Sequence, residues 1–354
     1  MKKKILIATG GTGGHMTPAL VIHDHLKKRF NLSISSDSRG LKFIDYKKYD
    51  LFVIETPRVF RNYFLIPFKM ICILVLIIKS FYYIKKKKID IIISTGGYAP
   101  VPICIAGIIL KKRLYIYEPN HVIGKSNRFF LPYCHKIFCH SKNLKKYPKK
   151  FTNKIFCLSP IVRKKFYKKS KKNKSKFTIM VIGGSQGAKI FDKYLHIVFS
   201  KILKKSSAKI IHQTKSDNVN YLRNFYNKNK ITNRVFNYDR NFADLIKSCN
   251  FCITRAGAST LAEIFILNIP FLAIPLSDSK DNHQLENAIY YKKKNCCWIL
   301  EEKNMSYRKI SNILKQILEN KNDFDLKKTS MIKLNRNINW NLQNKILIKE
   351  FNAS

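Results

Sequence analysis

Residues 4–15 read KILIATGGTGGH, a short apolar run that passes directly into a glycine-rich turn. Two further apolar runs precede glycine turns in the same way, Ile91–Ile93 before Gly96 and Ile179–Ile182 before Gly183. Continuous apolar strands that alternate with helical stretches are typical of parallel sheets covered by helices on both faces. The first and third turns lie about half a chain apart, so we predict an α/β protein built from two Rossmann-like doubly wound halves.

A change in charge marks the division between the two halves. The chain has 354 residues, which suggests two domains. Residues 163–176 contain nine basic residues among fourteen and no acidic one, so this run is predicted to be a solvated linker or surface loop. We therefore place the first domain at residues 1–160 and the second at 161–335. A polar helix at 336–354 is expected to fold back across one of them, with the first as the preferred partner.

Composition excludes some classes of protein. With 45% apolar residues the chain can bury two cores, which excludes a disordered protein and a small disulfide-stapled fold. The nine cysteines are an odd number and lie mostly in apolar runs, as reduced thiols of a cytosolic protein do. Cys249 and Cys252 form a CxxC with no second pair and no nearby histidine, so we expect no metal or redox centre there.

The net charge is the most unusual property of the composition. The 68 basic residues exceed the 21 acidic ones by 47. Such an excess favours a polyanionic partner, meaning nucleic acid, an anionic membrane or a phosphorylated substrate. A general drift toward lysine and asparagine, as an AT-rich genome produces, explains much of the same excess. The longest uninterrupted apolar run, Met70–Ile78, has nine residues and is too short to span a bilayer.

The glycine turns have the chemistry of phosphate sites without matching the common nucleotide fingerprints. The dinucleotide pattern GxGxxG fails because residue 16 is methionine, and Asp37 is a doubtful ribose acid. Gly183–Ala188 offers a nest of backbone amides but lacks the P-loop lysine. Arg255–Glu263 reads as a strand end, a turn and a helix start, where Glu263 is either a ribose ligand or a surface acid favoured by the helix dipole.

Six blocks of sequence together resemble the MurG family, the N-acetylglucosaminyltransferases of peptidoglycan synthesis. They occur in the family's order over most of the chain. The blocks are Gly10–His15 with Pro18–Leu20, Ser94–Tyr98, Tyr117–Asn120 with Gly124, Gly183–Ala188, His212–Thr214, and Arg255–Glu263 with His283–Ala288.

The resemblance implies a GT-B fold, two Rossmann-like domains facing across a cleft, and an inverting transfer without cofactor or metal. N-acetylglucosamine would pass from UDP-N-acetylglucosamine to the C4 hydroxyl of the muramyl sugar of lipid I, giving lipid II at the cytoplasmic face of the cell membrane. His15 is implied as the general base. The implied substrate-binding residues are Thr12, Gly13, Gly14, Asn120, Arg163, Ser185, Asp239, Ala258, Ser259, Thr260, Leu261, Ala262, Glu263 and Gln284.

Within that set, the resemblance gives Glu263 the ribose, Arg163 and Ser185 the UDP, and Gln284 a sugar hydroxyl. The chain departs from the family's His-Glu-Gln-Asn, since Pro119 stands where the glutamine would be. The segment around Asp239, where the uracil pocket should fall, also matches poorly.

Chemistry supports these assignments independently. A sugar hydroxyl needs a positioned base at neutral pH, and histidine titrates in a suitable range. The departing diphosphate of UDP would be stabilised by the amides of Gly183–Gly187 and the helix that begins there. His23 and His25 face different sides of a helix, so they are not expected to bind a metal.

The stretch Arg61–Lys88 suits a lipid-linked acceptor. Apolar residues, including Phe64, Leu65 and the run Met70–Ile78, are bracketed by cations such as Arg58 and Lys79. This pattern is typical of insertion into an anionic leaflet, although a buried helix of the first domain would account for at least half of the side chains. We expect one face in the core and the other against lipid, with cell-wall synthesis proteins as further partners.

Two other classes compete with this interpretation. A different GT-B enzyme, such as a UDP-N-acetylglucosamine 2-epimerase or a natural-product glycosyltransferase, would share the nucleotide half but not the blocks of the first half. A nucleic-acid-binding protein would explain the charge, yet the basic residues are spread widely and no recognised binding module is present. We expect no specific nucleic-acid partner.

Overall fold

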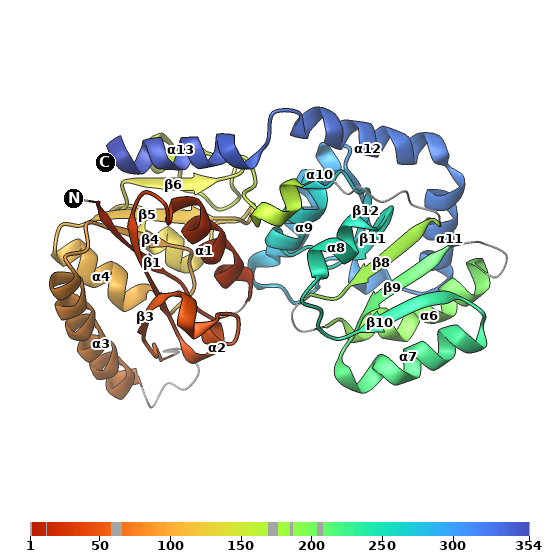
Figure 1. Ribbon diagram of the computed structural model, residues 1–354, viewed down its shortest axis with the longest axis horizontal. Helices are drawn as coiled ribbons and strands as arrows, with labels where there is room; N and C mark the ends of the chain where they lie inside the picture. The colour runs from red at the N-terminus through yellow and green to blue at the C-terminus, as the bar shows by residue number, and fades with distance from the viewer. Residues whose placement is uncertain are drawn as a thin grey trace. The chain divides into compact units, whose positions relative to one another are not determined.

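The computed structural model describes residues 2–11, 13–57, 66–168, 176–184, 187–203 and 208–353. The chain divides into two compact units, one made of Met1–Ile161 with Asn339–Ser354 and the other of Val162–Ile338. Each unit is an α/β fold around its own parallel sheet (Figure 1). This confirms the prediction of two doubly wound halves.

The first unit contains a seven-stranded parallel sheet in the order β3-β2-β1-β4-β5-β6-β7. Its strands are β1 (Lys4–Ala8), β2 (Asn31–Ser36), β3 (Asp50–Val53), β4 (Ile91–Ser94), β5 (Arg113–Glu118), β6 (Lys136–Cys139) and β7 (Ile155–Cys157). Its helices are α1 (Gly13–Leu26), α2 (Ser38–Leu41), α3 (Ile66–Lys87), α4 (Val101–Ile109), α5 (Lys125–Phe130) and α13 (Trp340–Ala353).

The second unit contains a six-stranded parallel sheet in the order β10-β9-β8-β11-β12-β13. Its strands are β8 (Thr178–Ile182), β9 (Lys209–Gln213), β10 (Thr232–Phe236), β11 (Phe251–Thr254), β12 (Phe271–Ala273) and β13 (Cys297–Ile299). Its helices are α6 (Lys189–Ile202), α7 (Ser216–Lys228), α8 (Phe242–Lys247), α9 (Ala258–Ile266), α10 (His283–Lys293), α11 (Tyr307–Glu319) and α12 (Lys321–Asn335). Short 3-10 helices in the chain include Lys149–Lys154, Lys164–Tyr167 and Glu302–Asn304.

The apolar strands are buried on both faces because successive side chains point to opposite sides of a sheet. In β1, Ile5 and Ile7 belong to one core cluster, whereas Leu6 and Ala8 belong to the cluster on the other face. Residues 179 to 182 of β8 alternate between two clusters in the same way. For this reason the apolar runs of β1, β4 and β8 are continuous in the sequence and do not alternate with polar residues.

The C-terminal helix α13 contributes to the core of the first unit. Leu347 and Phe351 are each 1% exposed and join the cluster that contains Ile5 and Ile7. The Phe351 ring meets the Tyr115 ring edge-on at 4.9 Å, and Trp340 stacks on His25 of α1 at 3.6 Å. The last residues of the chain therefore complete the layer of helices beside α1 (Figure 1).

The helix α3 is longer and more exposed than we expected. Ser80 and Ile84 are its buried residues, so the expectation that half of its side chains are buried overestimated the packing. Its partly buried side packs against α4, and large apolar side chains face outward, namely Phe68, Met70, Ile71, Leu74, Val75, Ile78 and Tyr82.

The helix α3 has 22 residues and contains a window of mean hydropathy 1.8. By length and composition alone it is sufficient to cross a membrane. The uninterrupted apolar run Met70–Ile78 is shorter than the helix because single lysines do not end it. Arg58, Arg61, Phe64 and Leu65 lie outside the described residues.

Candidate functional site

The glycine turn after β1 lies at the carboxyl edge of the first sheet, where open α/β folds bind ligands. Gly11 has a φ of +83°, which a side chain would strain. A Cβ on Gly10 would lie only 2.4 Å from the Cβ of Ala99. Both glycines are therefore required by the path of the chain, and the turn brings Gly13 and Gly14 to the partly exposed start of α1. Thr12 lies outside the described residues.

Asp37 holds this turn in place. Its Oδ1 accepts hydrogen bonds from the backbone N–H groups of Gly11 at 2.8 Å and Gly40 at 2.9 Å, and Arg39 Nε donates to its Oδ2 at 2.9 Å. Burial alone would raise the pKa of Asp37, but these hydrogen bonds outweigh it and lower the pKa. Asp37 therefore stabilises the turn through its hydrogen bond to the backbone of Gly11. From the sequence it was considered only as a candidate ribose-binding acid.

His15 is partly exposed near the start of α1, and its orientation is set by the end of β4. Its Nδ1 lies 2.9 Å from the carbonyl oxygen of Thr95, and Thr95 Oγ1 donates to the carbonyl of His15 at 3.2 Å. Because a carbonyl can only accept, Nδ1 carries the proton of the neutral ring and Nε2 is the basic nitrogen. A Cβ on Gly97, whose φ is +90°, would lie 3.6 Å from Nε2. Glycine at residue 97 therefore keeps the space beside Nε2 open.

Asn120 is oriented by the buried carboxylate of Glu118, the last residue of β5. Glu118 Oε1 accepts from the backbone N–H of Asn120 at 3.1 Å and from its Nδ2 at 2.9 Å. Oε2 accepts from the Gly124 N–H and from Asn127 Nδ2, both at 2.9 Å. Asn127 in turn lies close to Gly96: a Cβ added to Gly96 would be 3.0 Å from Asn127 Nδ2. One carboxylate therefore connects the loop after β5 to the loop after β4.

In the second unit, the buried carboxylate of Glu263 pairs with the partly exposed guanidinium of Arg163. Glu263 in α9 is 4% exposed, and its Oε1 accepts from Arg163 Nε at 2.9 Å and lies 2.7 Å from Nη2. The guanidinium of Arg163 lies over the Phe166 ring at 4.9 Å. Burial raises the pKa of Glu263 above its usual range, and the charge of Arg163 offsets part of that rise. Both residues were predicted to contact the donor, and the structure brings them into contact with each other.

The start of α9 presents backbone amides at the carboxyl edge of the second sheet. Gly257 precedes the helix without a side-chain cap, and Ala258, Ser259 and Thr260 are partly exposed. The first amides of a helix have no acceptor within it, so they can bind an anion or a sugar oxygen. Residues 261 and 262 also belong to the predicted set, but their side chains lie in the hydrophobic core, which leaves only their backbone for such contacts.

Gln284 in α10 ties two loops together. Its Oε1 accepts from the backbone N–H of Ala256 at 3.2 Å and of Leu276 at 3.1 Å. Since both partners are donors, the Nε2 group faces away from them and can donate elsewhere. Asn287, one turn further along α10, donates from Nδ2 to the carbonyl of Ala256 at 3.1 Å. Both the backbone N–H and the backbone carbonyl of Ala256, in the turn before α9, are therefore bound by side chains of α10.

The glycine loop after β8 is tightly folded. Gly184 and Gly187 have φ angles of +79° and +70°, and the Gly187 N–H donates to the Gly184 carbonyl at 3.1 Å. A Cβ on Gly183 would lie 2.6 Å from the backbone nitrogen of Ala188, which excludes any other residue there. Ser185 lies outside the described residues, as does Gln186.

Two predicted segments have mainly structural contacts. Asp239 accepts from the Asn241 N–H at 2.7 Å and pairs with Arg234. His212 is fully buried, and its Nδ1 lies 2.8 Å from the Tyr226 hydroxyl. Within the described part of the chain no group of three or more histidine, cysteine or acidic side chains is arranged to hold a metal ion.

Comparisons with known proteins agree across the whole chain. The model of the glycosyltransferase family 28 N-terminal domain matches residues 5–139, and that of the family 28 C-terminal domain matches residues 178–339. The chain is 43% identical to a UDP-N-acetylglucosamine--N-acetylmuramyl-(pentapeptide) pyrophosphoryl-undecaprenol N-acetylglucosamine transferase of Pelagibacter ubique, with all of both chains covered. It is 32% identical to the enzyme of that name from Rickettsia canadensis over 90% of this chain and 91% of the relative. The crystal structure of Acinetobacter baumannii MurG shares the fold, with a TM-score of 0.76, 22% identity and 98% of each chain covered.

Proposed function

The chain belongs to the MurG family of N-acetylglucosaminyltransferases, and we propose that its first unit activates the acceptor while its second unit holds the donor. The protein is a UDP-N-acetylglucosamine-dependent glycosyltransferase that moves N-acetylglucosamine onto the lipid-linked muramyl pentapeptide, forming lipid II for peptidoglycan. The identity over the full chain favours this activity over that of an epimerase or a natural-product glycosyltransferase of the same fold.

In the proposed mechanism, His15 Nε2 removes the proton of the C4 hydroxyl of the muramyl sugar. The observation that carries this step is the contact between Nδ1 and the Thr95 carbonyl, which leaves Nε2 as the basic nitrogen beside Gly97. The alkoxide that develops attacks the anomeric carbon of the donor in line with the departing UDP, so the configuration at that carbon inverts. Removing the proton during attack is worth about 10²- to 10⁴-fold in rate.

The second unit would hold UDP at the carboxyl edge of its sheet. Glu263 would accept hydrogen bonds from the ribose hydroxyls through Oε2, since its contacts with Arg163 are made through Oε1. Arg163 is partly exposed and would place positive charge near the nucleotide. Gln284 would donate from Nε2 to a sugar hydroxyl, and Asp239 would lie near the uracil. The amides of the glycine loop before α6 would stabilise the charge on the departing diphosphate.

The remaining predicted residues take the roles that the family resemblance implies. Thr12, Gly13 and Gly14 would line the space for the donor sugar and the acceptor diphosphate, and Asn120 would contact the donor sugar. Ser185 would contact the UDP with the backbone of residues 258 to 262. The proposed mechanism assigns no step to a metal ion or cofactor.

The helix α3 would attach the protein to the cytoplasmic face of the cell membrane. Its outward side combines apolar residues such as Phe68 and Ile71 with the exposed lysines 79, 85 and 86. Each fully buried large apolar side chain contributes about 1.5–3 kcal/mol, and each lysine at an anionic surface about 1 kcal/mol. The strands before and after α3 belong to one sheet, and α3 packs along α4. Since both ends of the helix return to that sheet, α3 would lie in the interface rather than cross the bilayer.

Calorimetric titration with UDP-N-acetylglucosamine, together with an assay of UDP release with and without a lipid I analogue, tests the proposal. We expect donor binding without the acceptor and UDP release only with it. UDP release without acceptor would point instead to an epimerase. Nanomolar RNA affinity at physiological salt with no donor binding would overturn the assignment and favour a nucleic-acid-binding protein.

A further inference from the structure

The guanidinium of Arg255 connects several parts of the second unit. Arg255 directly follows β11, and its Nη1 donates to the carbonyl oxygens of Ile274 at 3.2 Å and Pro275 at 3.4 Å. Its Nη2 donates to Glu302 Oε1 at 2.6 Å. The guanidinium also lies 5.0 Å from the ring centre of Phe191, in the first turn of α6. A single side chain therefore contacts the segment after β12, the segment after β13 and the helix that follows the glycine loop.

Glu302 extends this connection along the segment after β12. Its Oε2 accepts from the backbone N–H of Ser277 at 3.0 Å and from Ser277 Oγ at 3.1 Å. The preceding amide, that of Leu276, donates to Gln284 Oε1. The carbonyls of residues 274 and 275 and the amides of residues 276 and 277 are thus all bound by side chains from other elements.

The pair is shielded from water, which makes its geometry specific. The side chain of Arg255 is 11% exposed and that of Glu302 is 15% exposed. Burial alone would raise the pKa of Glu302, but the hydrogen bonds from Arg255 and Ser277 outweigh it and lower the pKa. A charged pair that has lost most of its water tolerates little displacement, because removing one partner leaves the other charge buried and unpaired.

We propose that Arg255 and Glu302 are positioning residues for the donor site, which fix the 274–277 segment beside the start of α9 and the first turn of α6. This inference rests on the proposed function, in which those two helix starts bind UDP-N-acetylglucosamine. Through Gln284, the same segment sets the direction of the amide group that would reach the donor sugar. Arg255 and Glu302 bind the protein rather than the substrate, so their effect passes through the placement of other groups.

The test uses Arg255→Lys and Glu302→Gln in the full chain. Lysine keeps the charge but lacks the planar fork that reaches two carbonyls and a carboxylate together. Glutamine can still accept from Ser277, but it removes the ion pair. For either variant we expect the KM for the donor to rise about tenfold, with kcat within about twofold of the parent, which is the pattern of lost ground-state binding.

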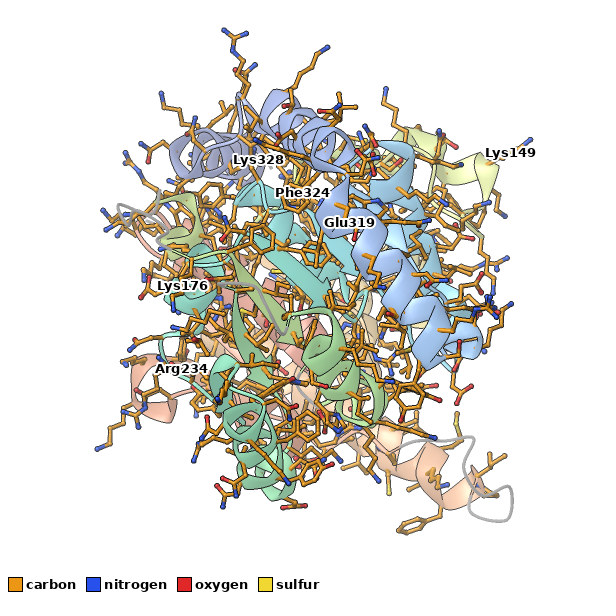
Figure 2. The ribbon with its side chains drawn as sticks, turned by 90° about the vertical axis from the view of Figure 1, so that its right-hand side faces the viewer. Lys149, Lys176, Arg234, Glu319, Phe324 and Lys328 are labelled. Carbon is orange, nitrogen blue, oxygen red and sulfur yellow. The ribbon has the colours of Figure 1, made fainter. Side chains whose placement is uncertain are left out.

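Lys327→Met is a matched control in the same unit. Lys327 is a buried cation that contacts Asp323 at 2.8 Å and Asn295 at 3.0 Å. Lys327 and Asp323 belong to α12, the helix in which Figure 2 labels Phe324, and Asn295 precedes β13 whereas Glu302 follows it. The control therefore breaks another ion pair with a buried cation in the same unit. We expect it to lower stability without changing the donor KM.

Hydrogen–deuterium exchange gives a second readout that does not depend on activity. Arg255→Lys should speed exchange of the amides of Leu276 and Ser277 and leave exchange in α11 and α12 unchanged. Lys327→Met should speed exchange in α11 and α12 and leave Leu276 and Ser277 unchanged. An unchanged donor KM and unchanged exchange in a folded Arg255→Lys protein would overturn the inference. An equal rise in KM in Lys327→Met would also overturn it, since the effect would then be general. If the parent protein releases no UDP with acceptor, the proposed function fails, and the exchange result still decides the positioning role.

Discussion

The His15 region of the first unit and the Glu263 region of the second are held in different ways. His15 is oriented by a backbone carbonyl, at 2.9 Å from Thr95, and by the space that Gly97 leaves beside its ring. Glu263 is oriented by the charge of Arg163, and the neighbouring loop by the Arg255–Glu302 pair. The partner of His15 is an uncharged carbonyl, whereas the charge of Arg163 favours the ionised form of Glu263 and offsets part of the rise in its pKa that burial causes. The group proposed to transfer a proton is thus held by an uncharged partner, and the group proposed to bind the ribose by a charged one.

The largest effect should come from removing the imidazole. His15→Ala is expected to lower kcat by about 10²- to 10⁴-fold because the acceptor hydroxyl loses its base. Donor affinity measured by calorimetry should stay within about twofold, since most of the proposed donor-binding groups lie in the other unit. His135→Ala is a suitable control, because His135 is exposed and distant in sequence from the glycine turn. A His15→Ala protein that binds the donor weakly but turns over normally would reverse the assignment of roles.

The second effect concerns the pair of Glu263 and Arg163, and it should depend on pH. Arg163→Ala should weaken donor binding and destabilise the fold by about 1–3 kcal/mol, because the buried carboxylate loses a partly exposed hydrogen-bond donor. Burial already raises the pKa of Glu263 above its ordinary 4.5. A carboxyl group whose pKa is raised on folding keeps a proton that the unfolded chain releases, so stability falls as pH rises above the unfolded value.

Denaturant unfolding at two pH values measures this dependence. Without Arg163 the pKa of Glu263 rises further, so the loss of stability should be larger at pH 7.5 than at pH 5. In a protein that also carries Glu263→Gln, the loss of stability caused by Arg163→Ala should be the same at the two pH values. A loss that is independent of pH in Arg163→Ala would show that Glu263 is not the group responsible.

A smaller effect is expected on membrane attachment, which the account assigns to the first unit alone. Replacing both Phe68 and Ile71 with serine should weaken binding to anionic lipid vesicles by about tenfold or more, since each side chain contributes more than about 1 kcal/mol. Co-sedimentation with vesicles measures the loss. Leu326→Ser with Ile332→Ser on α12 removes comparable exposed apolar side chains from the second unit and should leave vesicle binding unchanged.

The smallest of these effects should come from Gly97→Ala. The new Cβ would lie 3.6 Å from His15 Nε2, on a backbone with a φ of +90°. The strain of such a backbone costs about 1–2 kcal/mol. We expect kcat to fall by about tenfold or less with unchanged donor affinity, because the base is crowded and not removed. A rise in donor KM without a change in kcat would place residue 97 in the donor site instead.

Much of the fold could be predicted because its signals are local. The runs of β1, β4 and β8 are uninterrupted because both faces of each sheet are covered, and the glycine turns follow directly. For α3, the outward apolar face was expected from the stretch Arg61–Lys88, but the share of buried side chains was overestimated. The count of consecutive apolar residues also stopped at Lys69 and Lys79, whereas the helix continues through both.

The supporting residues of the site could not be predicted because their contacts are distant in sequence. Arg255 meets Glu302 across 47 residues, and Asp37 meets Gly11 across 26. Nothing in the sequence near Glu302 marks it as part of a site. Glu118 did carry a usable signal, an acidic residue at the end of an otherwise apolar strand, which indicates a buried carboxylate with dedicated partners.

In the proposed mechanism, His15 of the first unit removes the acceptor proton while the second unit holds the donor. The most direct test is a single-turnover measurement of transfer to a lipid I analogue, with donor and acceptor both saturating, for the parent, His15→Ala and Glu263→Gln proteins. The account predicts a large fall in rate for His15→Ala. Glu263→Gln should approach the parent rate once its weaker donor binding is saturated. A His15→Ala protein that transfers at the parent rate under these conditions would contradict the account.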